Sequence, residues 1–282
     1  MTPMIEMQFA KGHGTENDFV IVSDRDGTAE PTTAQVQWLC DRHAGIGADG
    51  LLRAVRARHI PEWTGDRDIW FMDYRNADGS IAEMCGNGLR VFVRYLLDRD
   101  RLDDTDRDAD GNYRIGTRAG ERTATALPDG RIRVSMGPVA IGARPAVIET
   151  GGQHYTAVPV DVGNPHAVVF ADRIDDLDLT TAPGHSTEDF PHGVNVEFAT
   201  IDADRIRMRV FERGVGETRS CGTGTVAVAA AAAIGTDTTG WTVDVPGGTV
   251  EVTLPSEDDP RAYLTGPAEI VAFGVALVPE TS

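Results

Sequence analysis

The sequence predicts an α+β protein made of two similar halves, each with many strands around one central helix. The pattern Cys-Gly-polar-Gly occurs twice, at residues 85–88 and 221–224, and an apolar helical segment follows it each time. In each half an asparagine-bearing turn precedes this pattern. Short apolar runs separated by turns rich in glycine and proline fill most of the remaining chain, which is typical of strands. The repeated order indicates an internal duplication.

The first half is expected to contain several strands and two helices. Apolar runs place the strands at residues 4–9, 19–23, 51–55, 69–74, 114–117, 122–126 and 131–136. Helical spacing places one helix at residues 33–42 and a second helix that begins near Asn87. Residues 11–18 are expected to form a polar loop, and residues 56–68 an irregular excursion.

The second half follows a similar plan. Its expected strands are residues 155–160, 167–170, 194–200, 205–211, 241–245, 250–254, 263–265 and 270–278. The helix after Cys221 is apolar all round, so strands should enclose it, and Gly235 is expected to end it. The dipeptide Gly137-Pro138 marks the expected boundary between the halves.

The composition excludes several classes of partner. Among the 282 residues, 44 are acidic and 26 basic, and the formal net charge of -18 disfavours nucleic acid and anionic membranes. No apolar run is long enough to span a bilayer, and the N-terminus lacks the pattern of a secretory signal. We therefore expect a cytoplasmic protein with a small-molecule partner. The acidic run at residues 98–110 is expected to be a solvated loop.

The three cysteines predict neither a disulfide framework nor a metal site. Their number is odd, and the chain has no Cys-x-x-Cys pair. Cys40 lacks the glycines that surround the other two cysteines and is expected to be a small buried apolar residue. The chain also lacks a phosphate-binding loop and a G-x-G-x-x-G pattern after a strand, so we expect no cofactor and no metal.

The two repeated patterns predict acid–base chemistry by thiols. A cysteine at the amino end of a helix is expected to ionise more readily than a free cysteine, whose pKa is about 8.5. With one thiolate and one thiol on opposite faces of a carbon, Cys85 and Cys221 would invert a stereocentre. The N–H groups of residues 86–88 and 222–224 would bind the carboxylate oxygens that gain negative charge. A single cysteine is more often a buried apolar residue, but the repeated glycine context favours catalysis.

The other polar candidates are less specific. His166 and Glu212 are as consistent with a turn histidine and a solvated carboxylate as with groups that tune the pKa of a thiol. Arg213, beside Glu212, offers a fork for a carboxylate and a partner for an ammonium group. Four asparagines are also candidates, although asparagine ordinarily serves as a turn or cap residue. They are Asn17, Asn76, Asn164 and Asn195.

Together these motifs resemble the diaminopimelate epimerase family over nearly the whole chain. The matching segments are residues 11–19 (KGHGTENDF), 76–80 (NADGS), 84–88 (MCGNG), 163–166 (GNPH), 212–218 (ERGVGET) and 220–224 (SCGTG). The resemblance implies cofactor-independent interconversion of LL- and meso-2,6-diaminopimelate, in the synthesis of lysine and cell-wall precursors. It also implies two pseudo-symmetric halves, each a β-barrel-like, mostly antiparallel sheet around a central helix, with the active site in the cleft between them.

The resemblance also assigns roles and boundaries. Cys85 matches the family's proton acceptor and Cys221 its proton donor in the LL to meso direction, and His166 and Glu212 match residues that tune the thiols. The first half would comprise residues 1–135 and a returning strand at 267–282, and the second half residues 136–266. The implied substrate contacts are Asn17, Asn76, Gly86, Asn87, Asn164, Asn195, Glu212, Arg213, Gly222 and Thr223.

Two positions depart from the family pattern. Many members have Phe-Asp-Gln where this chain has Ala48-Asp49-Gly50, so a glutamine contact to the substrate is missing or replaced. A tyrosine associated with dimerisation in some relatives is replaced by Ala272. The homodimer is therefore expected from the overall resemblance alone.

Three other functions fit parts of the pattern. A two-thiol racemase for proline or hydroxyproline would share the repeated patterns, but its small substrate would not need Glu212, Arg213 and four asparagines. A thiol-disulfide redox protein would require an exposed thiol or a Cys-x-x-Cys-like motif, although facing thiols are expected to form a reversible disulfide on oxidation. A non-catalytic amino acid binding protein would keep its binding after loss of either cysteine.

Overall fold

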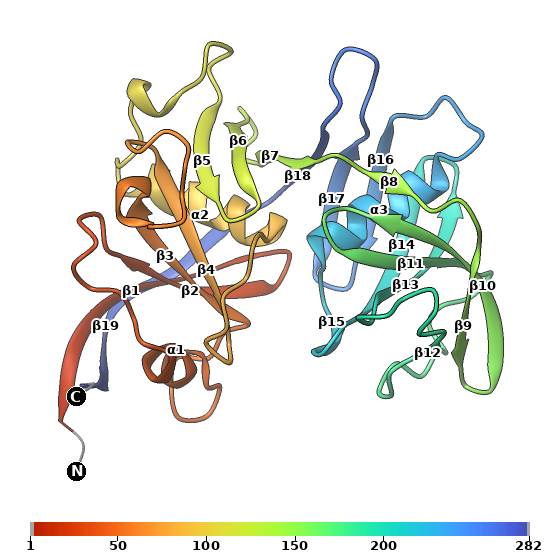
Figure 1. The fold of residues 1–282 in the computed structure, drawn as a ribbon, viewed down its shortest axis with the longest axis horizontal. Helices are drawn as coiled ribbons and strands as arrows, with labels where there is room; N and C mark the ends of the chain where they lie inside the picture. The colour runs from red at the N-terminus through yellow and green to blue at the C-terminus, as the bar shows by residue number, and fades with distance from the viewer. Residues whose placement is uncertain (1–2, 281–282) are drawn as a thin grey trace. The chain divides into compact units, whose positions relative to one another are not determined.

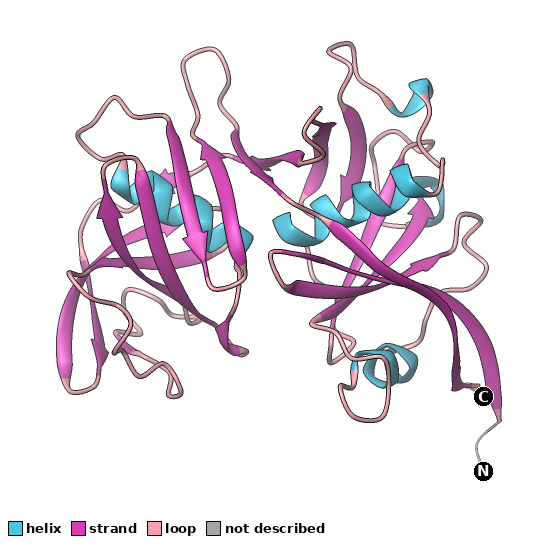
Figure 2. Ribbon diagram, turned by 180° about the vertical axis from the view of Figure 1, so that it is seen from behind, coloured by secondary structure: helices cyan, strands magenta, loops and turns pink. Residues whose placement is uncertain are grey.

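The computed structural model describes residues 3–280, which fold into two compact units. Of these, residues 3–134 and 267–280 belong to the first unit, and Ser135–Gly266 is the second (Figure 1). In each unit, strands surround one long helix (Figure 2). The α+β class predicted from the sequence, with a central helix in each half, is therefore confirmed.

The first unit is built on a sheet with the order β19-β1-β2-β3-β4-β5-β6-β7. Its helices are α1 (Thr33–Cys40) and α2 (Gly86–Asp98), with 3₁₀ turns η1 (Ala57–His59) and η2 (Asp104–Asp106). Its strands are β1 (Met4–Gly14), β2 (Asn17–Ser23), β3 (Gly50–Arg56), β4 (Trp70–Asn76), β5 (Tyr113–Thr117), β6 (Gly120–Ala126), β7 (Ile132–Gly137) and β19 (Glu269–Pro279).

The second unit has the sheet order β12-β9-β10-β11-β13-β14-β16-β17-β18, with β8 paired to β10 and β15 to β14. Its helix is α3 (Gly222–Ala232). Its strands are β8 (Ala140–Ile141), β9 (Ala146–Thr150), β10 (Gln153–Asp161), β11 (Pro165–Phe170), β12 (Gly184–His185), β13 (Asn195–Asp202), β14 (Arg205–Glu212), β15 (Gly216–Thr218), β16 (Gly240–Val245), β17 (Gly248–Thr253) and β18 (Ala262–Gly266).

The two units repeat the same succession of strand pairings around their helices. From β1 to β7, successive pairs are antiparallel, parallel, antiparallel, parallel, antiparallel and antiparallel. The succession β10, β11, β13, β14, β16, β17, β18 follows the same order. In the chain, α2 lies between β4 and β5, and α3 lies between β14 and β16. The duplication inferred from the repeated cysteine patterns is therefore present in the sheet topology.

The central helices lie inside their sheets because each buries many apolar side chains. Alanine and valine cover every face of α3, which contacts β10, β11, β13, β14, β16, β17 and β18, as its sequence predicts. The helix α2 is packed against β1, β2, β3, β4 and β19. After α3, Gly235 adopts the left-handed conformation, with φ 77°, that favours glycine at a helix end.

The polar loop predicted at residues 11–18 is wrong. β1 continues to Gly14 and β2 begins at Asn17, so only Thr15 and Glu16 form the turn. Both turn residues have positive φ, 51° and 62°, as in the two-residue turns that match the twist of a hairpin. Neither is the glycine or asparagine usual at such positions, which is why the sequence conceals the hairpin. A β-ladder therefore holds Asn17.

Two further expectations need correction at α1 and in the short strands. The helix α1 ends at Cys40, two residues early, because the Asp41 carboxylate accepts the N–H groups of His43 and Ala44, both at 2.7 Å. The strands β8, β9, β12 and β15 were not predicted. Three of them have only two or three residues, which is too short for a periodic pattern to emerge.

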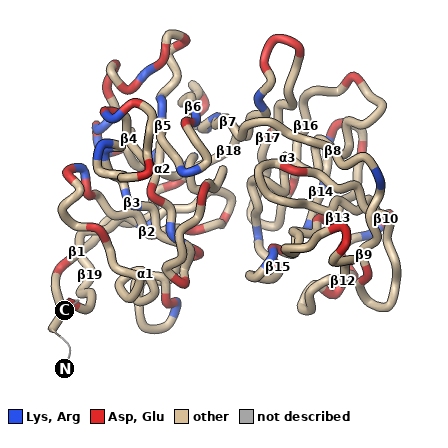
Figure 3. Tube along the Cα trace, viewed as in Figure 1, with Lys and Arg blue, Asp and Glu red and all other residues tan. Residues whose placement is uncertain are grey.

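The acidic run at residues 98–110 is not simply a solvated loop. Asp106 in η2 is buried and accepts a hydrogen bond from Arg56 Nη1 at 2.7 Å. The Arg56 guanidinium also lies 4.3 Å from the centroid of a Trp70 ring. Elsewhere, acidic and basic positions are spread over the loops and strands of each unit (Figure 3). The pairing partner of Asp106 lies 50 residues earlier in the chain, so charge patterning does not reveal it.

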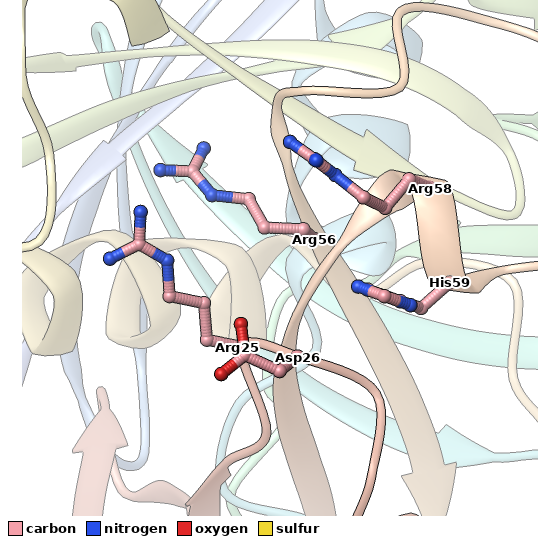
Figure 4. Close-up of a pocket in the computed structure, with 5 residues that line it drawn as sticks. All are labelled: Arg25, Asp26, Arg56, Arg58 and His59. Carbon is pink, nitrogen blue, oxygen red and sulfur yellow. The ribbon is translucent and has the colours of Figure 1, made fainter.

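One cavity of about 160 Å³ lies in the first unit (Figure 4). Its lining residues are Arg25, Asp26, Arg56, Arg58 and His59. Most of its positive charge is already neutralised, because Arg56 pairs with Asp106 and Arg58 with Asp68. None of the predicted site residues lines it. Among the described residues, no helix has the length and hydropathy needed to cross a bilayer.

Candidate active site

Cys85 is the N-cap of α2. Its backbone is extended, with φ -144° and ψ 119°, and its sulfur accepts a hydrogen bond from the N–H of Gly88 at 3.3 Å. The thiol thus takes the place that serine, threonine, asparagine or aspartate usually holds at a helix start. This position directs the sulfur at the N–H groups and the positive dipole end of the helix.

One asparagine contacts the sulfur of Cys85, and a second asparagine contacts the first. The Oδ1 atom of Asn17 lies 3.6 Å from Cys85 Sγ and 3.3 Å from Asn87 Nδ2. The other amide atom, Asn17 Nδ2, donates to Asp49 Oδ2 at 2.7 Å, and Asp49 Oδ1 accepts from Arg42 at 2.7 Å. The Asn17 amide is therefore fixed with its oxygen towards the thiol. Asp49 was not predicted to take part.

Asn76 ends β4 opposite Gly50, the first residue of β3. Its side-chain N–H donates to Ser80 Oγ at 3.0 Å and its backbone N–H to the Ser80 carbonyl at 2.9 Å, so it also closes a turn. Gly50 has no room for the glutamine of many family members. A Cβ there would lie 2.6 Å from the Arg75 carbonyl oxygen and 2.7 Å from Tyr74 Cε2.

The guanidinium of Arg90 lies fully buried in α2, and the sequence analysis did not predict it as a site residue. Its Nε donates to the Pro267 carbonyl and its Nη2 to Thr15 Oγ1, both at 3.3 Å. Its Nη1 has no hydrogen-bond partner among the described residues. Burial lowers the pKa of Arg90 to about 10, while attraction to Cys85 opposes that change. Arg90 is therefore still a cation at neutral pH, and it favours the thiolate of Cys85.

Cys221 is the N-cap of α3 and is buried. Its backbone is extended, with φ -122° and ψ 114°, and its sulfur accepts a hydrogen bond from the N–H of Gly224 at 3.4 Å. Thr223 Oγ1 lies 3.5 Å from the same sulfur. The carbonyl of Cys221 accepts from Thr225 Oγ1 at 2.7 Å, which fixes the first turn of the helix.

A line of hydrogen bonds leads from Thr223 to a buried carboxylate. Asn164 Nδ2 donates to Thr223 Oγ1 at 3.3 Å, and Asn164 Oδ1 lies 3.0 Å from His166 Nε2. His166 Nδ1 lies 2.7 Å from Glu197 Oε1, and both side chains are 0% exposed. Glu197 was not predicted as a site residue. Its signal in the sequence is a lone charge inside the apolar β13.

A second group gathers at the adjoining ends of β13 and β14. Asn195 Oδ1 accepts from the backbone N–H of Arg213 at 2.9 Å, and Asn195 Nδ2 donates to the Pro165 carbonyl at 3.3 Å. Arg213 is exposed, and its Nη1 donates to the His192 carbonyl at 2.8 Å. Glu212 is half-buried and accepts from the Thr218 hydroxyl.

The expectation that a helix N-terminus makes both thiols more acidic is wrong for Cys221. Burial raises the pKa of Cys221 well above its ordinary value, and the negative charges of Glu212 and Glu197 raise it further. The hydrogen bonds from Thr223 and Gly224 lower it by less. For Cys40, burial raises the pKa to about 12, in keeping with the predicted small apolar role.

The structure therefore brings the predicted residues into two separate groups. In the first unit, which we call the first half-site, Asn17, Asn87 and Cys85 lie together, with Gly86 as the first residue of α2. In the second unit, the second half-site, a connected group is formed by Asn164, His166, Cys221 and Thr223, with Gly222 as the first residue of α3. Asn76 in the first unit, and Asn195, Glu212 and Arg213 in the second, lie at nearby strand ends.

The family model of diaminopimelate epimerase matches residues 9–141 and 158–271 of the chain. The chain belongs to the diaminopimelate epimerase family. A diaminopimelate epimerase of Thermobifida fusca (strain YX) is 50% identical over 277 residues, which cover 95% of this chain and 97% of the relative. One of Corynebacterium glutamicum (strain R) is 47% identical over 283 residues, which cover 96% and 98%. The family resemblance inferred from the motifs is confirmed.

Solved structures outside the diaminopimelate epimerase family share this fold. A PhzF-family phenazine biosynthesis protein of Bacillus anthracis has a TM-score of 0.70 and 16% identity, with coverage of 98% of this chain and 100% of that chain. A hydroxyproline epimerase of Agrobacterium vitis, with bound trans-4-hydroxy-L-proline, has a TM-score of 0.69 and 17% identity, with coverage of 99% and 95%. At these identities, the likeness concerns the fold alone.

Proposed function

We propose that this member of the diaminopimelate epimerase family interconverts LL- and meso-2,6-diaminopimelate by moving an α-proton between two thiols. The observation that carries the proposal is the pair of N-cap cysteines. Each sulfur, that of Cys85 and that of Cys221, accepts a hydrogen bond from the second glycine of its own pattern. Family membership, with relatives up to 50% identical, supports the choice of substrate.

The proposed step balances without an outside reagent. The thiolate of Cys85 takes the α-proton of the LL substrate, and the electron pair of the broken C–H bond moves into the adjacent carboxylate. The thiol of Cys221 then gives its proton to the opposite face of the same carbon. After one turnover Cys85 is the thiol and Cys221 the thiolate, which is the state that starts the reverse reaction.

The charges around the sulfurs support this assignment of roles. The buried cation of Arg90 attracts a negative Cys85, whereas Glu212 and Glu197 oppose a negative charge on Cys221. Before LL substrate binds, the first half-site is therefore suited to a proton acceptor and the second to a donor. This charge difference is what a two-base epimerase requires of two otherwise similar thiols.

Substrate binding is proposed to use both backbone and side-chain groups. The N–H groups of Gly86 and Asn87, with those of Gly222 and Thr223, would hold the carboxylate beside the reacting carbon and stabilise its growing charge. The distal amino acid group would contact the remaining polar residues, which can accept from an ammonium and donate to a carboxylate. These are Asn17, Asn76, Asn164, Asn195, Glu212 and Arg213.

The test of this function is α-proton exchange measured on separate amino acids. The purified protein would be incubated in deuterated water with LL-diaminopimelate, meso-diaminopimelate, L-proline or trans-4-hydroxy-L-proline, and deuterium at the α-carbon followed by mass spectrometry. We expect exchange and interconversion with both diaminopimelate isomers and none with the two prolines. Absence of exchange with diaminopimelate would contradict the proposal, and exchange with a proline alone would favour a proline-type racemase.

We also infer that the protein forms a homodimer through β19. A row of apolar side chains on one face of this strand is exposed, namely Val271 at 56%, Phe273 at 52%, Val275 at 58% and Leu277 at 56%. Alternate residues of a strand share a face, so the row is continuous, and a second copy would remove it from water. Sedimentation equilibrium should give a dimer for the wild type and a monomer for Phe273→Glu. A monomeric wild type at micromolar concentration would refute the inference.

A further inference from the structure

The carboxylate of Glu197 lies in an unusual place for a charged group. It comes from β13 into the interior of the second unit, where it is 0% exposed, and its Oε2 has no hydrogen-bond partner among the described residues. It also approaches the thiol of Cys221 across Gly224. A Cβ on Gly224 would lie 2.6 Å from Glu197 Oε1 and 3.3 Å from Cys221 Sγ. Glycine at this position therefore leaves the space in which carboxylate and sulfur come close.

The first unit shows that the fold does not need a charged pair here. Two residues after Asn17 in β2 and after Gly50 in β3 lie Phe19 and Leu52, which are fully buried. Both would be 3.4 Å from a Cβ on Gly88, an ordinary apolar contact.

The second unit has His166 and Glu197 at the equivalent places, two residues after Asn164 and Asn195. The same scaffold therefore holds an apolar pair under one cysteine and an ionisable pair under the other. Because ionisable groups are costly to bury, a role in the chemistry explains the pair better than a role in packing.

We propose that Glu197 is a positioning residue: its carboxylate, close to the sulfur across Gly224, keeps Cys221 protonated, and through His166, Asn164 and Thr223 it directs the S–H towards the substrate. This inference rests on the proposed function and deepens it, because it names the group that makes Cys221 the donor. Glu197 itself contacts neither substrate nor the reacting carbon in this proposal.

The hydrogen bonds explain how the orientation is passed on. Because Asn164 Nδ2 donates to Thr223, the Asn164 oxygen must accept the Nε2–H of His166. The other imidazole nitrogen, Nδ1, then forms the hydrogen bond with Glu197 Oε1.

Thr223 Oγ1 accepts the hydrogen bond from Asn164, so its own hydroxyl hydrogen is available to the sulfur of Cys221. The two atoms, Oγ1 and Sγ, are 3.5 Å apart. With that hydroxyl hydrogen directed at the sulfur, Cys221 would receive hydrogen bonds from both Thr223 and Gly224, which leaves the hydrogen of the thiol itself for another acceptor. In the proposed reaction that acceptor is the α-carbon.

The charges around Cys221 come from three strands. Glu197 on β13, His166 on β11 and Glu212 at the end of β14 are the titratable groups that face it. On the other strands packed against α3, the charged side chains alternate with the inward apolar residues and lie on the outer face, as in Asp244 of β16 and Glu251 of β17. No arginine or lysine of the described residues forms an ion pair with Glu197.

The test is the pH dependence with which each thiol reacts with iodoacetamide, followed by mass spectrometry of the separate Cys85 and Cys221 peptides. In Glu197→Gln, which keeps the shape and removes the charge, the pH midpoint of Cys221 alkylation should fall by about one unit, which is about a tenfold rise in the ionisation constant. The midpoint for Cys85 should not move. The matched control is Glu149→Gln, an exposed carboxylate of the same unit, which should change neither midpoint.

The inference is overturned if the pH midpoint of Cys221 alkylation is the same in Glu197→Gln as in the wild type, or if it shifts by as much as the midpoint of Cys85. The alkylation readout requires no turnover, so it decides the inference even if the protein does not act on diaminopimelate. With an active enzyme, Glu197→Gln should lower kcat at least tenfold while KM stays within about twofold, because Glu197 acts on the donor and not on substrate binding. A rise in KM at constant kcat would also overturn it.

A second variant tests the same idea from the other side of the contact. Gly224→Ala would place a methyl group 2.6 Å from Glu197 Oε1 and force the carboxylate away from the sulfur. The Cys221 midpoint should again fall relative to the wild type. If Gly224→Ala leaves the midpoint unchanged while circular dichroism shows a folded protein, the proximity of Glu197 to the thiol has no effect and the inference fails.

Discussion

The two half-sites share a backbone frame and differ in the sign of the charge placed near the sulfur. In both, the cysteine is an N-cap whose sulfur accepts an N–H from the second glycine, and an asparagine lies at the start of a neighbouring strand. Two residues after this second glycine, the first unit has the cation Arg90, whereas the second unit has Val226. Beneath the second glycine, the first unit has Leu52 where the second has Glu197. Duplication thus supplies matched geometry, and a few buried charges place the two thiols in different electrostatic surroundings.

The largest expected effect comes from removing either thiol. If the two cysteines act as acceptor and donor, Cys85→Ala and Cys221→Ala should each lower kcat for epimerisation by roughly 10²- to 10⁴-fold. Cys40→Ala is the matched control, because Cys40 packs in an apolar cluster of the first unit and should leave kcat unchanged. Epimerisation that persists in either of the first two variants would show that the half-sites do not work as a pair.

The next effect concerns the cation of the first half-site. Arg90→Met keeps the length of the side chain but removes the charge that attracts the Cys85 thiolate. The pKa of Cys85 should rise, so the alkaline shift in the pH profile of kcat/KM should be about one unit and the loss at neutral pH about tenfold. An Arg90→Met enzyme with the wild-type pH profile would mean that this cation serves only to bind the Thr15 and Pro267 oxygens.

A third experiment would make the second half-site resemble the first. The double variant His166→Phe/Glu197→Leu copies the apolar pair Phe19 and Leu52 into the equivalent places. Because apolar replacement of a buried ionic pair is often neutral or stabilising by about 1–4 kcal/mol, the free energy of unfolding should be maintained or increased. Activity should fall. Urea denaturation and the epimerisation assay measure the two outcomes, and loss of folding would show that the pair is structural.

The smallest effect is a dependence of stability on alkaline pH. Burial raises the pKa of Cys40 to about 12 and raises the pKa of Cys221 well above its ordinary value. Above pH 9 the unfolded state ionises these thiols while the folded state retains their protons, so the unfolding free energy must fall with rising pH. Each thiol should contribute up to about 1.4 kcal/mol per pH unit. Cys40→Ala should remove its share between pH 9 and 12, and an unchanged slope would contradict the assignment.

The sequence predicts what depends on local pattern. Both central helices, the cysteines at their amino ends and most strands follow from periodicity and from the repeated Cys-Gly-polar-Gly pattern. The hairpin at Thr15 and Glu16 escapes prediction because its left-handed residues are not those that favour this conformation. The very short strands escape because two or three residues have no period.

The residues that distinguish the half-sites are not predicted from the sequence, for a different reason. Glu197 and Arg90 carry charge into the interior, and only strand register or helix packing reveals what each one faces. Local reasoning was also misleading for the acidity of Cys221. The helix N-terminus favours the thiolate, but burial and two carboxylates outweigh it, and these depend on β13 and β14. Tertiary surroundings therefore decide the acid–base character that the local motif only makes available.

The pairing of β1 with β19 has a consequence for how the molecule is made. β1 hydrogen-bonds to β19 along nearly its whole length, and β19 also packs against α2. The first unit therefore needs a strand that is synthesised after the entire second unit, whereas Ser135–Gly266 is contiguous. During translation the second unit can fold as it emerges, while the first must wait with one side of α2 uncovered. Nascent chains that lack β19 should accordingly be the ones that chaperones and proteases recognise.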